Sequence, residues 1–431
     1  MINPSLSIAQ PQTTGKYLVL LPADDVNAGI RALSDRIGTR SIARAADVAN
    51  HALSGEQLES VETLVLDDIA VAVVTLDPEQ LQSVNMAIAD ASQPVLAIEP
   101  EQIMYALGDT GFSKGAEYLQ GYRDAINNLV DQLLLPTEQQ IQMAAFTEDQ
   151  ATWGLQATKV VDSPFSGRGI KVAVLDTGLD LNHPDFAGRQ IITESFINGE
   201  QVQDGQGHGT HCIGTATGPL TPPTLPRYGV AYDAEIYVGK VLSNQGSGAD
   251  RGILAGINWA VSNGCQVISM SLGAPTRPGD SYSWIYEMVS RRALRMGSLI
   301  IAAAGNESRR DFGIINPVAR PANCPSIMAV AALDSQLRVA NFSNRGINPD
   351  GGQIDIAGPG VNVYSTWPLP TRYRTISGTS MATPHVAGIA ALYAESTGAR
   401  GEALWNLLIQ NAQRLVLPAA DVGAGLAQAP M

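Results

Sequence analysis

The sequence predicts an α/β protein that consists of a small α+β unit followed by a larger unit built on a mostly parallel sheet. Residues 16–107 alternate strands and helices in an order typical of a split βαβ, ferredoxin-like sandwich. From about residue 147, near-continuous apolar strands alternate with helices, which indicates a parallel sheet covered on both faces. With 431 residues, of which 45% are hydrophobic, the chain is long enough for two or three domains.

Hydrophobic periodicity gives the elements of the small unit in order. "KYLVLLP" (16–22) predicts a strand, and "NAGIRALSDRIG" (27–38) predicts a helix that Gly38 closes. We expect one or two strands in 62–76, a helix over 77–92 that Asp77 and Pro78 start, and a last strand in "QPVLAIEPEQIMYAL" (93–107). Residues 108–146 predict a connector with an amphipathic helix at about 116–134, since its apolar residues have helical spacing.

The larger unit, 147–431, carries polar residues directly after its buried strands. Asp176 follows "KVAVL", Ser271 to Gly273 follow "QVISM", and Asn306 follows "LIIAAAG". Because ligands and substrates bind at the carboxyl ends of the strands in such sheets, we expect these residues to share one rim.

Composition excludes several function classes. A net charge of −14 and a pI near 4.8 argue against nucleic acid or an anionic membrane surface as partners. No apolar run is long enough to span a membrane, and the start has no signal-peptide pattern, so we expect a cytoplasmic protein unless a signal has been removed. Three cysteines without CxxC spacing predict neither a disulfide framework nor a zinc cluster.

The stretch "SGTSMATPH" (377–385) places a serine before a buried helical segment. If Ser380 lies in the first turn, where we also expect Pro384, free backbone N–H groups and the helix dipole suit a developing negative charge. A serine nucleophile needs a base and an orienting group, for which His208 in "DGQGHGTHC" and Asp176 are the best candidates. Taken singly, each motif is more often a cap or a turn, and only their conjunction indicates catalysis.

Five segments in order, "AVLDTGLDLNHPDF", "GHGTHCIGT", "ISMSLG", "AAAGNES" and "SGTSMATPHVAG", resemble the subtilisin-like serine proteases, the subtilase family. The resemblance implies a three-layer domain and a self-processing serine endopeptidase that needs no cofactor for its chemistry. It implies Ser380 as nucleophile, His208 as general base, Asp176 as its orienting carboxylate and Asn306 as an oxyanion donor. It also implies that an extended peptide substrate binds along Gly246, Ser247, Gly248, Ser271, Leu272 and Gly273, with Ala319 at the floor of the main pocket.

Family resemblance further implies that 16–107 is a propeptide that inhibits its own enzyme after cleavage between Leu107 and Gly108. Asp185 matches one calcium-ligand position, but the asparagine-bearing loop that completes the calcium site in subtilisins is missing, so we expect no strong site. Two alternatives remain open: a peptide ligase or cyclase of the same fold, and an inhibited, non-catalytic peptide-binding module. No insertion suggests the water-excluding lid that a ligase needs, and all four candidate catalytic residues are present.

Overall fold

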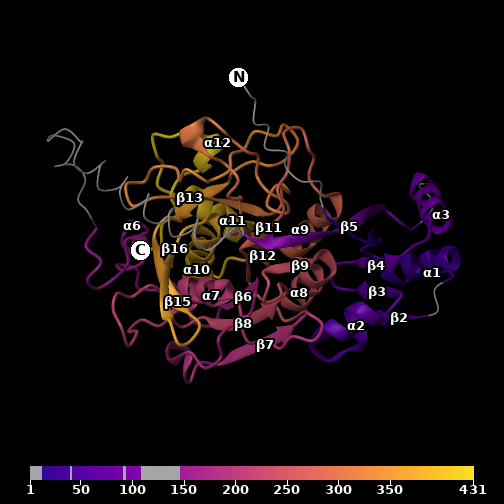
Figure 1. Cartoon of the computed structure of the whole chain (residues 1–431), viewed down its shortest axis with the longest axis horizontal. Coiled ribbons are helices and arrows are strands. Elements are labelled where there is room, and N and C mark those ends of the chain that lie inside the picture. The colour runs from indigo at the N-terminus through magenta and orange to yellow at the C-terminus, as the bar shows by residue number, and fades with distance from the viewer. Residues whose placement is uncertain (1–11, 39–40, 91–93, 108–145) are drawn as a thin grey trace.

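The computed structural model describes residues 12–38, 41–90, 94–107 and 146–431 (Figure 1). We call 12–107 the small unit and 146–431 the large unit. The connector helix predicted at 116–134, and Gly108, lie outside the described residues.

A parallel sheet of seven strands forms the centre of the large unit, where the sequence predicts a mostly parallel sheet. In space its strands follow the order β14-β13-β12-β10-β6-β8-β7, and every neighbouring pair is parallel. Their bounds are β6 Lys171–Asp176, β7 Ile191–Ser195, β8 Glu235–Lys240, β10 Val267–Met270, β12 Leu299–Ala303, β13 Met328–Leu333 and β14 Ile356–Pro359.

Helices cover both faces of this sheet, because alternate residues of each strand belong to two separate apolar cores. Val172 and Val174 of β6 pack in one core with α7 (His208–Thr217) and α10 (Thr379–Thr397). Ala173 and Leu175 pack in the other core with α8 (Asp250–Ser262) and α9 (Trp284–Arg295). The three-layer α/β architecture predicted from the sequence is thereby confirmed.

The remaining elements of the large unit lie around these layers. They are α6 Trp153–Ala157, α11 Gly401–Gln410, α12 Ala419–Val422, two short 3₁₀ turns, the edge strands β9 Ser247–Ala249 and β11 Leu272–Gly273, and a hairpin of β15 Val363–Trp367 and β16 Arg372–Ile376. Among the described residues, no helix combines the length and the apolar character that a membrane crossing requires.

The small unit contains β1 Thr13–Leu20, α1 Val26–Ile37, β2 Ile42–Arg44, α2 Gly55–Ser60, β3 Thr63–Leu66, β4 Val71–Thr75, α3 Pro78–Ala89 and β5 Ala97–Ala106. Its strands follow the order β5-β1-β4-β3-β2, so β4 lies between β1 and β3, and β1 lies between β4 and β5. This is the split βαβ order expected of residues 16–107. The predicted caps are present: Asp77 forms a capping box at α3, and Gly38 closes α1 in the left-handed region at φ 64°.

Strand β5 joins the two units. Its first half pairs with β1, and residues 103–106 lie between β9 and β11 of the large unit, antiparallel to both. Figure 1 shows β5 extending from the small sheet toward β11. One face of the small sheet, including Leu18, Leu66 and Val73, belongs to the same core as α8 and α9, and α1 and α3 cover the opposite face.

Candidate active site

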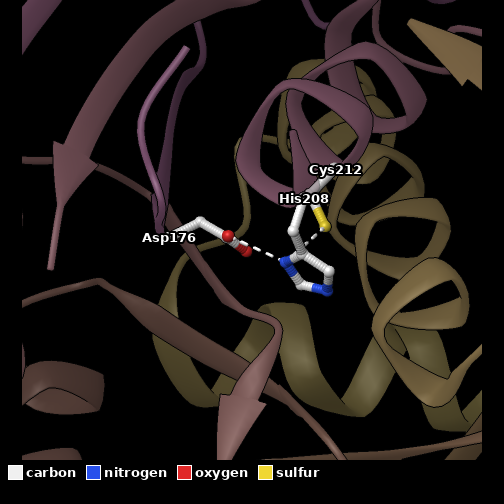
Figure 2. Close-up of side chains that lie close together, drawn as sticks. All are labelled: Asp176, His208 and Cys212. Carbon is white, nitrogen blue, oxygen red and sulfur yellow. Dashed lines mark hydrogen bonds and ion pairs between the residues drawn. The ribbon is translucent and has the colours of Figure 1, made fainter. Parts of the chain in front are cut away.

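The imidazole of His208 lies beside the carboxylate of Asp176. Asp176 is the last residue of β6 and His208 the first of α7, so a buried strand and a helix start fix their backbones. His208 Nδ1 is 2.8 Å from Asp176 Oδ1, and both side chains are buried (Figure 2). Because Nδ1 donates to the carboxylate, Nε2 carries the lone pair when the ring is neutral, as a general base requires.

Asp204, which was not predicted from the sequence, positions the start of α7. Its Oδ1 accepts hydrogen bonds from the backbone of Gly207 and from Thr177 Oγ1, and its Oδ2 accepts from the backbone and the hydroxyl of Thr210. One buried carboxylate therefore connects the residue after Asp176 to both sides of His208. The glycine-rich turn at 205–207 was the available sequence signal, since such turns are often held by a preceding aspartate.

Gly207, the residue before His208, has a φ of 110°, and a Cβ there would lie 2.4 Å from the ring of Trp367. Only glycine allows this conformation and this approach without displacing the ring. The turn that connects Asp204 to the first residue of α7 therefore requires glycine at position 207.

Ser380 is the second residue of α10, as expected, but Pro384 is not in the first turn. The helix begins at Thr379, so Pro384 lies a turn further on, inside the helix. Since proline has no N–H, the carbonyl of Ser380 has no helical partner at that position. Instead it accepts from Ser271 Oγ at 2.8 Å and lies 3.6 Å from Cys212 Sγ. Because of the proline, the carbonyl of Ser380 is free to contact Ser271, which lies between β10 and β11, and Cys212 of α7.

Cys212 lies between the two halves of the site. One turn after His208 on α7, its sulfur is 3.9 Å from His208 Nδ1 (Figure 2), and it also contacts the carbonyl of Ser380. Burial raises the pKa of the Cys212 thiol, so it is neutral at ordinary pH. Asp176, His208 and Cys212 bring ligand-type atoms within 4.8 Å of one another, but the hydrogen bond between the carboxylate and Nδ1 already engages the first two.

The hydroxyl of Ser380 and the free nitrogen of His208 do not share a hydrogen bond in this state. Ser380 Oγ donates to the carbonyl oxygen of Leu107 and lies 3.2 Å from the carbonyl of Ser271. His208 Nε2 is buried without a partner among the described residues. The hydroxyl is therefore turned toward the chain that fills the groove.

The carbonyl oxygen of Leu107 also accepts from Asn306. Asn306 Nδ2 is 2.5 Å from this oxygen, and Asn306 Oδ1 accepts from the backbone N–H and the hydroxyl of Thr379, which fixes the orientation of the amide. A Cβ on Gly378 would lie 3.1 Å from the same oxygen, so a residue without a side chain permits this approach. Ser380 Oγ and Asn306 Nδ2 therefore both donate to the carbonyl oxygen of Leu107.

The predicted substrate-binding residues line the last residues of β5. Leu107 N donates to Ser271 O at 3.1 Å, and Ala106 N donates to Gly246 O at 2.9 Å. In the ladders, Leu272 and Gly273 pair with Ala106 and Tyr105, and Ser247 and Gly248 pair with Tyr105 and Met104. Both edge strands therefore hold the backbone of residues 103–107 in extended form.

The Leu107 side chain occupies an apolar pocket. It clusters with Ala303 and Ala319 and is 2% exposed. A Cβ on Gly273 would lie 3.0 Å from Leu107 Cδ1, so this glycine makes room for a branched side chain. Ala319 therefore lines the pocket that holds Leu107, and its role at the floor of a substrate pocket stays a prediction.

The pKa of His208 reflects two opposing causes. Burial alone would lower it, but the Asp176 carboxylate beside Nδ1, with a contribution from Cys212, raises it well above its ordinary value. Two other histidines differ: burial lowers the pKa of His211 to about 3 and of His385 to about 4. They remain neutral and hold backbone carbonyls, Met381 O in the case of His385.

Asp185 does not offer a calcium ion an unoccupied carboxylate. The hydroxyls of Tyr228 and Tyr373 both donate to it, and the His183 ring lies 3.6 Å away. Tyr228 and Tyr373 are also in edge-to-face contact. Since Ca²⁺ requires six to eight oxygen ligands, this aromatic surrounding does not fit the ion.

An oriented imidazole, a serine and an amide donor at one carbonyl, and a groove that holds an extended chain define a serine peptidase. The model of the subtilase family matches residues 167–426. The chain therefore belongs to the subtilase family, which confirms the resemblance, and it is a serine endopeptidase that acts on peptides or proteins. Members of the family need no cofactor for catalysis.

The chain is similar to several bacterial subtilisins. It is 40% identical to subtilisin DY of Bacillus licheniformis over 239 residues, which are 55% of this chain and 81% of that protein. It is 43% identical to subtilisin Savinase of Lederbergia lenta over 244 residues, 56% of this chain and 82% of that protein. With subtilisin E of Bacillus subtilis the identity is 41% over 240 residues, 55% of this chain and 58% of that protein.

Proposed function

We propose that the protein is a self-processing zymogen whose large unit cuts the chain between Leu107 and Gly108 by means of Asp176, His208 and Ser380. The observation that carries this proposal is the position of Leu107: Ser380 and Asn306 donate to its carbonyl oxygen, and its N–H pairs with Ser271. No other peptide group in the described residues combines these contacts. Residues 16–107 would then be the propeptide, 108–146 the connector and 147–431 the catalytic domain.

In the proposed reaction, Ser380 Oγ attacks the carbonyl carbon of Leu107 while His208 Nε2 takes the hydroxyl proton. Asp176 stabilises the resulting imidazolium, and Asn306 Nδ2 donates to the oxyanion. The bond to the Gly108 nitrogen then breaks, and His208 returns its proton to the leaving amine. Water hydrolyses the acyl-enzyme, which releases a carboxylate at Leu107 and restores the serine.

The same contacts support inhibition by the cut propeptide. Its last residues keep both ladders and the apolar pocket, so the product occupies the path that a peptide substrate would follow. A carboxylate at Leu107 would still be within reach of Asn306 and Ser380.

The proposal is tested by following the mass and the N-terminal sequence of the purified chain over time. We expect a fragment that begins at Gly108, hydrolysis of an unstructured protein that a serine-directed phosphonate blocks, and no fragment from Ser380→Ala. Removal of Asn306 in Asn306→Ala should slow self-cleavage by about 10²- to 10³-fold, the cost of one oxyanion donor.

Processing that persists in Ser380→Ala would refute the triad, and a first cut near Pro136 would refute the site. Joined peptides instead of hydrolysis products would favour the ligase alternative. Circular dichroism and thermal unfolding of each variant serve as the control for folding.

A further inference from the structure

Upstream of the groove, β5 crosses the N-terminal end of α8. Residues 99–102 precede the part of β5 that pairs with β9 and β11. At this point α8 presents its first two residues, Asp250 and Arg251, and both contact β5. The large unit therefore contacts the extended chain beyond the ladders of β9 and β11.

Asp250 holds the backbone of Gln102. The N–H of Gln102, the sixth residue if Leu107 is counted as the first before the cut, donates to Asp250 Oδ2 at 2.9 Å. Residues of the large unit fix this carboxylate: Tyr286 donates to Oδ1 at 2.9 Å, and Arg320 lies 3.1 Å from Oδ2. Since Tyr286 and Arg320 belong to the large unit, the carboxylate is oriented by contacts that do not involve the small unit.

Arg251 holds the side chain of Glu101, the seventh residue before the cut. Glu101 Oε1 accepts from the backbone N–H of Arg251 at 2.9 Å, and Oε2 lies 2.6 Å from its guanidinium. Glu101 is fully buried, so this pair is largely shielded from water in the full chain. A carboxylate here receives two charge-assisted contacts, and an amide or an amine could not reproduce both.

We propose that Asp250 and Arg251 form a further substrate subsite, which binds the sixth backbone N–H before the cut and an acidic side chain at the seventh position. This inference rests on the proposed function, because the position of the cut defines the count. The enzyme then favours peptide segments that continue at least seven residues upstream of the cut and carry Glu or Asp there.

The contacts that Glu101 makes within the small unit define the rival explanation. Thr14 also donates to Glu101, and Arg251 also contacts Glu59. A peptide substrate brings neither Thr14 nor Glu59. If Arg251 serves only to dock the small unit, peptides will show no preference at the seventh position.

The test uses the full chain, incubated until its activity is constant, and fluorogenic peptides that end in Met-Tyr-Ala-Leu before the leaving group. Extending the peptide upstream to Ile, Gln and Glu should raise kcat/KM on reaching the sixth residue and again at the seventh. Peptides with Glu, Gln or Lys at the seventh position are then compared. We expect kcat/KM of the Glu peptide to exceed that of the Gln peptide by about three- to tenfold, and the Lys peptide to have the lowest kcat/KM. High salt should reduce this preference.

In Arg251→Gln, the ratio of kcat/KM for the Glu peptide to kcat/KM for the Gln peptide should approach one. Arg295→Gln, which removes an exposed arginine from the last turn of α9, is the matched control and should keep the ratio. Cleavage of all peptides with no dependence on length or on the seventh residue would refute this inference alone. No cleavage of any peptide would refute the proposed function instead.

Discussion

The two sheets of the molecule are covered in different ways. Helices of the large unit itself, α7 and α10 on one face and α8 and α9 on the other, cover the parallel sheet. The small sheet has α1 and α3 on one face, and its other face shares a core with α8 and α9 of the large unit. Helices of the same unit therefore cover both faces of the parallel sheet, whereas docking against the large unit covers one face of the small sheet.

Polar contacts strengthen this docking at the helix starts. Glu99 of β5 accepts from Ser283 Oγ at 2.6 Å and from the backbone of Ile285 at 3.2 Å, at the beginning of α9. Carboxylates are stabilised at such positions by unpaired N–H groups and the helix dipole. The small unit is thus bound by apolar surface and by charge, and both can be varied separately.

The largest effect is expected where the two units meet in the catalytic groove. Leu107→Asp would place a carboxylate in the apolar pocket of Ala303 and Ala319, and burying an unpaired charge costs about 3–5 kcal/mol. We expect self-cleavage at 107 to slow by at least about 10²-fold, as measured by mass spectrometry. Leu107→Met, which keeps an apolar side chain of similar volume, should retain cleavage, and equal rates in both variants would contradict the pocket assignment.

Low pH should reduce mainly the stability of the large unit. His211 and His385 have pKa values lowered to about 3 and about 4, so the unfolded chain binds protons first, and stability falls as pH drops from about 6.5 toward these values. At pH 4 each of these two histidines should lower the free energy of unfolding by about 3 kcal/mol relative to neutral pH. His208, whose pKa is raised, contributes in the opposite direction, with stability that is lost as pH rises.

Denaturant unfolding of Ser380→Ala at pH 7 and pH 4 would measure this difference. His385→Asn should flatten the pH dependence, because it removes one buried group that titrates. Stability of the large unit that does not change over this range would contradict the burial of two neutral histidines.

A smaller effect is expected from the face of the small sheet that depends on docking. Leu66→Ala, in the Ser380→Ala background, should lower the free energy of opening of the small unit by about 2–4 kcal/mol. Hydrogen exchange should show faster amides in β1, β3 and β4 and unchanged amides in β6 and β10. Val174→Ala in the parallel sheet is the matched control, and a uniform change in both sheets would show that the units open together.

The smallest effect is expected from removal of calcium. Since two tyrosine hydroxyls engage Asp185, a chelator should leave the thermal unfolding of the large unit within about 1 °C of its value without chelator. Differential scanning calorimetry with and without EDTA measures this. A large fall in the melting temperature would identify a calcium site elsewhere.

Sequence patterns predicted most of the fold because long, strongly periodic segments dominate it. The strands β6, β10 and β12 and the helices α1, α3 and α10 lie where hydrophobic runs and caps predicted them, whereas the outer strands β7 and β14 were not predicted. The short elements β2 and α2 were not predicted, since three to six residues carry too little periodicity. For α2 a signal existed, because Ser54 and Gln57 form its capping box.

Candidates for the site could be selected from the sequence where a residue type is itself the chemistry, as for Asp176, His208, Asn306 and Ser380, and their catalytic roles stay a prediction. Asp204 was not found because its role depends on Thr177 and Thr210, which only the folded chain brings to it. Pro384 was placed a turn too early, since the start of a helix rich in small residues is poorly marked in sequence. The role of its missing N–H becomes visible only beside Ser271 and Cys212.

Strand β5 belongs to the small sheet and also lies in the groove of the large unit. If the proposed processing holds, this arrangement has a kinetic consequence. Because one molecule contains both the scissile bond and the groove, the first cut should be a first-order event whose half-time does not depend on how dilute the protein is. Destruction of the released fragment by another enzyme molecule would be second order and would accelerate at high concentration. The maturation of a population would then begin independently in each molecule and finish collectively.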